Sequence, residues 1–164
     1  MNNSTKFYLK CKACGEEVSD FREWFQHGQV CPTCGHNEAE VIYPGGYDKL
    51  LKLIKASGFN PKSVWGYFDF LPLKDSSNIV SSGEEGIKPI NRWEFLEQFA
   101  RDKYNINIKV YGHRHDLHQA TGTFKDLAGT VVSSVLKEQG IDHLVAASTG
   151  NIGVAYARYL AAAG

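Results

Sequence analysis

The chain of 164 residues is long enough for one domain of ordinary size or two small units, and 43% hydrophobic and 22% charged residues are typical of a globular protein. Its formal net charge of zero argues against nucleic acid as the main partner, because phosphate binding normally requires a basic face. The sequence contains no run of about 18 apolar residues and no apolar signal segment, so we expect no membrane partner and a cytoplasmic location.

Four cysteines lie near the start of the chain in the pattern C-x2-C-x16-C-x2-C, at Cys11, Cys14, Cys31 and Cys34. Two pairs with this spacing offer four thiolates from two tight turns, which suits tetrahedral zinc. Gly15 and Gly35 follow the two pairs and permit the positive φ angles that such turns often need. Since four cysteine ligands leave no position for a catalytic water, the pattern predicts a structural zinc ribbon over residues 1–43.

Two other interpretations of the cysteines are weaker. Disulfides or a redox pair are disfavoured in a reducing cytoplasm, where cysteine clusters more often hold metal. Nucleic-acid binding by the ribbon is disfavoured by its charge, because residues 1–43 carry four basic and six acidic side chains.

Residues 44–90 are predicted to be a connecting segment. Within it, "YDKLLKLIKASGF" places Tyr47, Leu50, Leu51 and Ile54 at helical spacing, and Gly58 is a helix stop signal. The stretch "VWGYFDFLPL" that follows is dense in aromatic residues. We expect it to be buried against another part of the molecule, since exposed aromatic clusters are rare in monomers.

Residues 91–164 alternate between helical and strand-like patterns. We predict a helix with Asn91 as its N-cap, a strand in "INIKVYG" at 106–112, a helix at 123–139 ending near Gly140, and a short buried strand in "DHLVAAS" at 142–148. A turn at "STGN" leads into a final helix. Strand, helix, strand and helix in this order are typical of an α/β fold with a parallel sheet.

The predicted α/β domain is incomplete. Two strands make a poor sheet, and the last helix is apolar almost all round, so it requires neighbours on more than one side. We expect the missing strands to come from a longer parent protein or from another chain.

The helix predicted after Thr123 carries a lysine on its apolar side. Lys125 falls between the directions of Val132 and Gly129, and the glycine leaves space beside it. Partial burial and the positive end of the helix both favour the uncharged amine, which is a nucleophile. The alternative is a lysine whose amine extends past the helix end into solvent.

The turn formed by Ser148, Thr149, Gly150 and Asn151 opens the last helix, where backbone N–H groups are unpaired and the helix dipole is positive. These features predict an anion site. Loops that follow adjacent parallel strands converge on one crevice, so we expect Lys125 and this turn to face the same pocket. The alternative is simple N-capping of the helix by Ser148 or Thr149.

Together, "ATGTFKD" and "ASTGNIGVA" resemble motifs of the type II pyridoxal-phosphate enzymes, and in particular the "PTGSFKD" and S-[ST]-G-N motifs of the threonine synthase family. An N-terminal cysteine ribbon is also similar to that of many members. The stretch "SSGEEGIKPI" resembles a weakened form of the family's "GEGxTPL" motif. The resemblance covers most of the chain and implies a small zinc ribbon followed by part of a type II α/β domain, here residues 91–164.

The resemblance also implies roles for individual residues. Lys125 would bind pyridoxal phosphate covalently and move the substrate's α-proton, and Asn151 would hydrogen-bond the cofactor's phenolic oxygen. Ser148, Thr149 and Gly150 would hold the carboxylate of a small amino-acid substrate. The implied reaction is that of a lyase in threonine biosynthesis, which converts O-phosphohomoserine to threonine and phosphate. A homodimer is compatible with this interpretation.

Gln119, Ala120 and Leu127 depart from the family pattern, and the family's glycine-rich phosphate loop and the group facing the pyridine nitrogen come later than residue 164. The chain is therefore expected to be an N-terminal piece of a longer enzyme. The alternatives are a truncated inactive paralogue that acts as a zinc-ribbon binding module, or another type II enzyme of the cysteate-synthase or ammonia-lyase kind. His113, His115 and His118 suggest a polar rim around the cleft rather than a second metal site.

Overall fold

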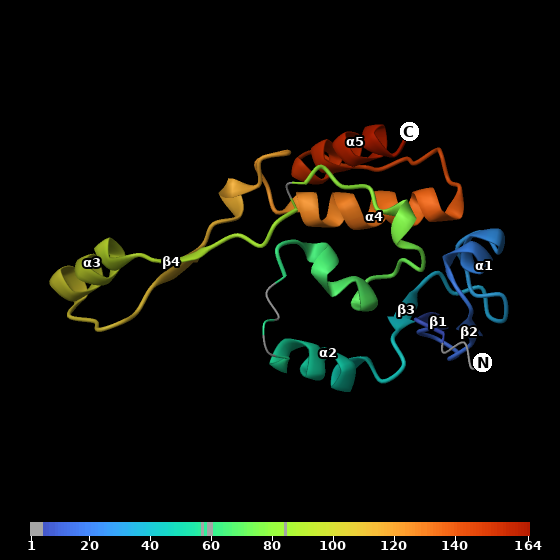
Figure 1. Cartoon of the computed structure of the whole chain (residues 1–164), viewed down its shortest axis with the longest axis horizontal. Coiled ribbons are helices and arrows are strands. Elements are labelled where there is room, and N and C mark those ends of the chain that lie inside the picture. Colours follow the sequence, from blue (N-terminus) through green and yellow to red (C-terminus); the bar gives the residue numbers. More distant parts are fainter. Residues whose placement is uncertain (1–4, 57, 59–60, 84) are drawn as a thin grey trace.

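The computed structural model describes residues 5–56, 58, 61–83 and 85–164 (Figure 1). These residues form a mixed α/β structure with two small sheets, one of three strands and one of two. Residues 1–4 of the predicted ribbon and Glu84 of the "SSGEEGIKPI" motif lie outside the described residues. No helix in the described part of the chain is long and apolar enough to cross a membrane.

The cysteine-containing segment folds into an antiparallel sheet of order β2-β1-β3, with β1 at Tyr8–Cys11, β2 at Glu17–Val18 and β3 at Ala39–Ile42. Helix α1, Phe21–Gln26, begins at Asp20, whose side chain accepts a hydrogen bond from Glu23 N at 3.1 Å. Ser19 N and Oγ donate in return to the Glu23 carboxylate, so the helix start is capped from both sides.

The connecting segment contains helix α2 at Gly46–Lys55 and two 3-10 helices, η1 at Val64–Phe70 and η2 at Ser76–Asn78. The predicted helix is confirmed but ends at Lys55, before Gly58. The aromatic stretch in η1 is half-buried, as expected. Its Trp65 indole donates to Thr130 Oγ1 at 3.0 Å, and its Phe70 ring lies 6.5 Å from Tyr43.

Residues 90–113 form an arm that extends away from the rest of the molecule (Figure 1). Strand β4, Ile90–Arg92, pairs antiparallel with β5, Tyr111–His113, and helix α3, Glu94–Tyr104, lies between them. Asn91 is therefore in a strand, and its predicted role as N-cap is wrong, because the helix begins after Trp93.

The strand predicted at 106–112 is reduced to β5 at its end. The reason is local. Asn105 adopts a left-handed φ of 52°, which turns the chain back along its own helix. Val110 then bonds to the start of the helix: its O accepts from Trp93 N at 2.9 Å, and its N donates to the Glu97 carboxylate at 2.9 Å. The segment is occupied by these contacts instead of by a parallel strand.

After the short 3-10 helix η3, His115–Leu117, two helices lie side by side and run in the same direction (Figure 1). Helix α4 spans Lys125–Gln139 and ends at Gly140 with φ 68°, as predicted, and α5 spans Asn151–Ala163. The predicted buried strand at 142–148 is wrong: the segment forms no strand, and Val145 is 100% exposed.

The predicted parallel sheet is likewise not found among the described residues, whose strand pairs are all antiparallel. A parallel strand is stable only between neighbours and beneath covering helices. Residues 142–148 have no such neighbour in the described chain, so they form no strand and are exposed.

Candidate functional site

The four cysteines converge at one end of the ribbon. Their sulfur atoms all lie within 4.8 Å of one another, with 3.7 Å between Cys11 and Cys34 and 3.5 Å between Cys14 and Cys31. Four sulfurs at 2.3 Å from a central zinc ion would be about 3.8 Å apart, so the arrangement fits tetrahedral zinc. Within the described residues this is the one group of three or more cysteine, histidine or acidic side chains placed to hold a metal ion.

Two matching turns present these thiols. Cys11 N donates to Glu16 O and Gly15 N donates to Cys11 O, and the second turn repeats both bonds between Cys31, Gly35 and His36 at distances of 2.7 and 2.9 Å. The predicted positive φ angles are confirmed at 80° for Gly15 and 73° for Gly35. The backbone therefore holds both pairs in the conformation that a metal would require.

The electrostatics of the thiols favour a cation. A backbone hydrogen bond from Cys14 lowers the pKa of Cys11 to about 6. A backbone bond from Glu16 would also lower the pKa of Cys14, but the Cys34 sulfur and burial together raise it to about 12. Thiolates this close repel one another, so only a bound cation would let all four ionise together.

Lys125 is the first residue of α4 and is half-buried. Its amine lies 4.5 Å from the centre of the Phe124 ring, a side chain that is itself 48% exposed. Its backbone N donates to Thr123 Oγ1 at 3.4 Å. The side chain thus rests on an aromatic face at the helix start.

The predicted space beside Gly129 is absent. A Cβ on Gly129 would lie 2.5 Å from Tyr159 Cδ2 and 3.2 Å from Ala155 O, because α5 packs directly against this position. The glycine therefore permits close approach of two helices and leaves no room for Lys125. The sequence pattern identified the helix but could not show which neighbour fills the gap.

The buried side of α4 agrees with the predicted apolar side at Val135 and Leu136 and differs from it elsewhere. Its buried residues include Thr130, Ser133 and Ser134, whereas Val131 and Val132 are only half-buried. Ser134 Oγ accepts a hydrogen bond from Val80 N at 2.8 Å, so the small polar face is used to bind the connecting segment. The valine face is left partly uncovered.

Asp126 shapes the loop that precedes Lys125, and the sequence analysis did not identify it. Its carboxylate is fully buried and accepts hydrogen bonds from Thr121 N at 3.2 Å and from Thr121 Oγ1. Gly122 N donates to His118 O at 2.7 Å and closes the same loop. The sequence did offer a signal for this role, because Asp126 is an acidic residue in the first turn of the predicted helix.

Ser148 organises the turn before α5. Its Oγ accepts hydrogen bonds from Gly153 N at 3.0 Å and from Gly150 N at 3.3 Å. Thr149, Gly150 and Asn151 are exposed. Gly150 is the N-cap of α5, so the predicted N-capping by Ser148 or Thr149 is not found, although Ser148 Oγ accepts from one N–H of the first turn. The anion site at this turn stays a prediction.

Helices α4 and α5 pack in register. Gly129, one turn into α4, contacts Ala155, one turn into α5. Because the helices run in the same direction, Lys125 and the Ser148–Asn151 turn lie at the same end of the pair (Figure 1). The structure thus brings the two predicted motifs to one end of a helix layer without the parallel sheet that was expected to do so.

The three histidines cluster near the lysine loop, and the rings of His115 and His118 are stacked. The His113 and His115 ring centres are 4.0 Å apart, and His115 Nδ1 lies 3.2 Å from His118 Nε2. They border a small cavity of about 100 Å³ together with Leu127 and Tyr67. The histidine rim around a cleft stays a prediction.

Comparison with known proteins gives two relatives. A threonine synthase of Methanocaldococcus jannaschii is 31% identical over 150 residues, which cover 83% of this chain and 35% of the relative. A threonine synthase of Methanosarcina acetivorans is 30% identical over 160 residues, which cover 96% of this chain and 35% of the relative. The chain spans about a third of the length of these curated relatives. No family model and no solved structure matches it.

Proposed function

We propose that this chain is the N-terminal part of a threonine-synthase-like enzyme that depends on pyridoxal phosphate. The observation that carries the proposal is the in-register pair α4 and α5, which brings Lys125 and the Ser148–Asn151 turn to one end. The similarity to two threonine synthases over most of the chain supports the same assignment.

The residues at this end fit the cofactor's chemistry. Lys125 supplies a primary amine at the start of a helix, half-shielded from water, where it can react with an aldehyde and later carry a proton. When bound, pyridoxal phosphate supplies an electron sink for negative charge at the substrate's α-carbon. Asn151 is exposed at the start of α5 and would hydrogen-bond the cofactor's phenolic oxygen.

The exposed start of α5 would hold the substrate. Backbone N–H groups of its first turn and the positive helix end attract a carboxylate, and Ser148, Thr149 and Gly150 precede that turn. We propose O-phosphohomoserine as the substrate, with threonine and phosphate as products. Because the chain spans 35% of its relatives, the remaining parts of the site belong to the proposed longer protein.

The covalent role of Lys125 is testable by adding equimolar pyridoxal phosphate to the purified chain. We expect a visible absorbance that disappears in Lys125→Ala and persists in Lys137→Ala, an exposed lysine on the same helix. Borohydride reduction followed by peptide mass spectrometry should place the cofactor on Lys125 in preference to Lys137. Labelling spread evenly over surface lysines would contradict the proposal.

We also propose that the four cysteines bind structural zinc. Cys14→Ser removes one of the four ligands, so we expect loss of bound zinc and loss of the ribbon's cooperative unfolding, with little change in the helicity of α4 and α5. Metal analysis and circular dichroism measure these two effects. Freshly purified, reduced protein that contains no zinc would show the proposal to be wrong.

A further inference from the structure

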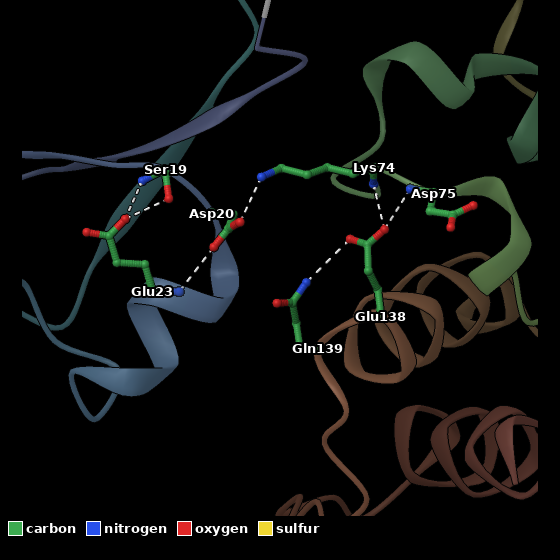
Figure 2. Close-up of polar contacts among 7 residues, drawn as sticks. All are labelled: Ser19, Asp20, Glu23, Lys74, Asp75, Glu138 and Gln139. Atoms are coloured by element: carbon green, nitrogen blue, oxygen red, sulfur yellow. Dashed lines mark hydrogen bonds and ion pairs between the residues drawn. The ribbon is translucent and has the colours of Figure 1, made fainter. Parts of the chain in front are cut away.

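The segment Leu71–Asp75, here called the strap, joins the cysteine ribbon to the far end of α4 (Figure 2). On one side, the Lys74 amine lies 2.7 Å from Asp20 Oδ2 in the ribbon. On the other side, the backbone N–H groups of Lys74 and Asp75 both donate to Glu138 Oε1, at 2.9 and 2.7 Å. One residue, Lys74, therefore contacts both parts of the molecule.

The contact of Lys74 with Asp20 depends on the packing of the ribbon around Cys11 and Cys31. Asp20 is fixed as the N-cap of α1, and Trp24 of that helix packs in one cluster with Cys11 and Cys31. That cluster contains only a few buried side chains, so it stabilises the ribbon weakly by itself. Release of a metal from the thiols should therefore loosen α1 and with it the position of Asp20.

A second contact ties the ribbon to the strap. The Lys6 amine donates a hydrogen bond to Leu73 O and lies 3.3 Å from the centre of the Phe68 ring. Burial lowers the pKa of Lys6, although Asp69 and Glu138 act to raise it. Leu73 itself is fully buried. The strap thus contacts the ribbon at two consecutive positions, Leu73 and Lys74, and it contacts α4 through hydrogen bonds to Glu138.

We propose that metal binding in the ribbon is transmitted through the strap to α4, so that loading the four thiols stabilises the C-terminal half of the helix that begins at Lys125. The inference rests on the proposed zinc site. Its physical basis is linkage: a metal that binds only the ordered ribbon also favours every contact that needs an ordered ribbon. The ribbon would then stabilise α4, the helix that begins at Lys125, in addition to folding as a separate unit.

The test is amide hydrogen exchange of the chain, measured by mass spectrometry with saturating zinc and after chelation, with bound zinc determined in parallel. Chelation should speed exchange of residues 133–139 about tenfold or more in the natural sequence. Glu138→Ala removes the acceptor on α4, and Lys74→Met removes the charge that faces Asp20 but keeps the backbone donors. Both should retain zinc. Glu138→Ala should lose most of this response, and Lys74→Met should lose only part of it, because the contact of Lys6 with Leu73 O remains.

Lys12→Met is the matched control, because it breaks an exposed ion pair with Glu38 at 3.4 Å that lies wholly within the ribbon. It should keep the full response. Two results overturn the inference: zinc binds but residues 133–139 exchange at the same rate with and without it, or Glu138→Ala responds like the natural sequence. If the natural sequence binds no zinc, the proposed zinc site is wrong, and the proposed transmission to α4 fails with it.

Discussion

Tyr159 is the side chain on which the helix pair depends. It is almost completely buried, its ring lies against Gly129, and its hydroxyl is 3.1 Å from Ser82 Oγ. Ser82 in turn donates to the buried Glu85 carboxylate at 2.8 Å. Burial raises the pKa of Tyr159, so its hydroxyl keeps its proton and remains a donor. A single tyrosine therefore links α5 to α4 and to the loop before the arm.

Gly129→Ala tests this packing. Alanine favours a helix by about 1 kcal/mol over glycine, so an isolated helix would become more stable. Here the new methyl would lie 2.5 Å from Tyr159, and we expect a net loss of about 1–3 kcal/mol in the free energy of unfolding. Urea denaturation measures it. Lys137→Ala, on the exposed side of α4, should change stability by less than about 0.5 kcal/mol, and a stabilised Gly129→Ala protein would refute the packing.

Gly129 also shows the limit of sequence reasoning at single residues. The 3.6-residue period placed it correctly next to Lys125 on one helix. It could not show that a ring from a residue 30 positions later fills the same space. By contrast, Gly15 and Gly35 were predicted correctly, because the requirement for positive φ is set by the turn itself.

At the scale of elements, the arm is held by the ion pair between Arg92, whose side chain is 46% exposed, and the buried Glu97. Arg92 donates to Glu97 through Nε at 2.9 Å and Nη2 at 2.7 Å, and Val110 N adds a third bond at 2.9 Å. Glu97 is 1% exposed and accepts all three of these hydrogen bonds, and the charge of Arg101 acts on it as well. The pair joins β4, α3 and the chain before β5.

The arm should therefore open in acid. The hydrogen bond from Arg92, with help from Val110 N, lowers the pKa of Glu97 to about 2 from an ordinary value of 4.5. A lowered pKa means that the contribution of Glu97 is complete above about pH 4.5 and is lost as pH falls towards 2. The Val110 amide resonance should report this loss by NMR. Glu97→Gln should remove the pH dependence, whereas Glu94→Gln, at the exposed partner of Arg92, should keep it.

Elements with local signals were predicted well, and elements that need distant partners were not. Helices α4 and α5 and the paired cysteine turns follow from periodicity, caps and spacing within a few residues. The strands at 106–112 and 142–148 had the right composition, but a strand exists only when another strand lies beside it. Residues 105–110 bond to their own helix instead, and 142–148 remain exposed.

At the scale of the whole molecule, several large apolar side chains of the described residues are exposed, and two groups of them lie on neighbouring positions. The arm exposes Phe95 and Phe99 on α3, and the segment before α5 exposes Leu144 and Val145. Contiguous apolar surface of this kind usually marks a face that another polypeptide covers. It agrees with the proposal that the chain is part of a longer enzyme, and it makes the isolated chain prone to associate.

Val145→Lys tests this view of the surface. Because Val145 is 100% exposed, a lysine there should lower concentration-dependent association, measured by light scattering, and change the free energy of unfolding by less than about 0.5 kcal/mol. Val135→Lys is the matched contrast on α4. There the same change buries an ammonium group and should cost about 3 kcal/mol or more. If the two substitutions destabilise the chain equally, residue 145 is covered by the chain itself, and the segment before α5 has no exposed apolar surface there.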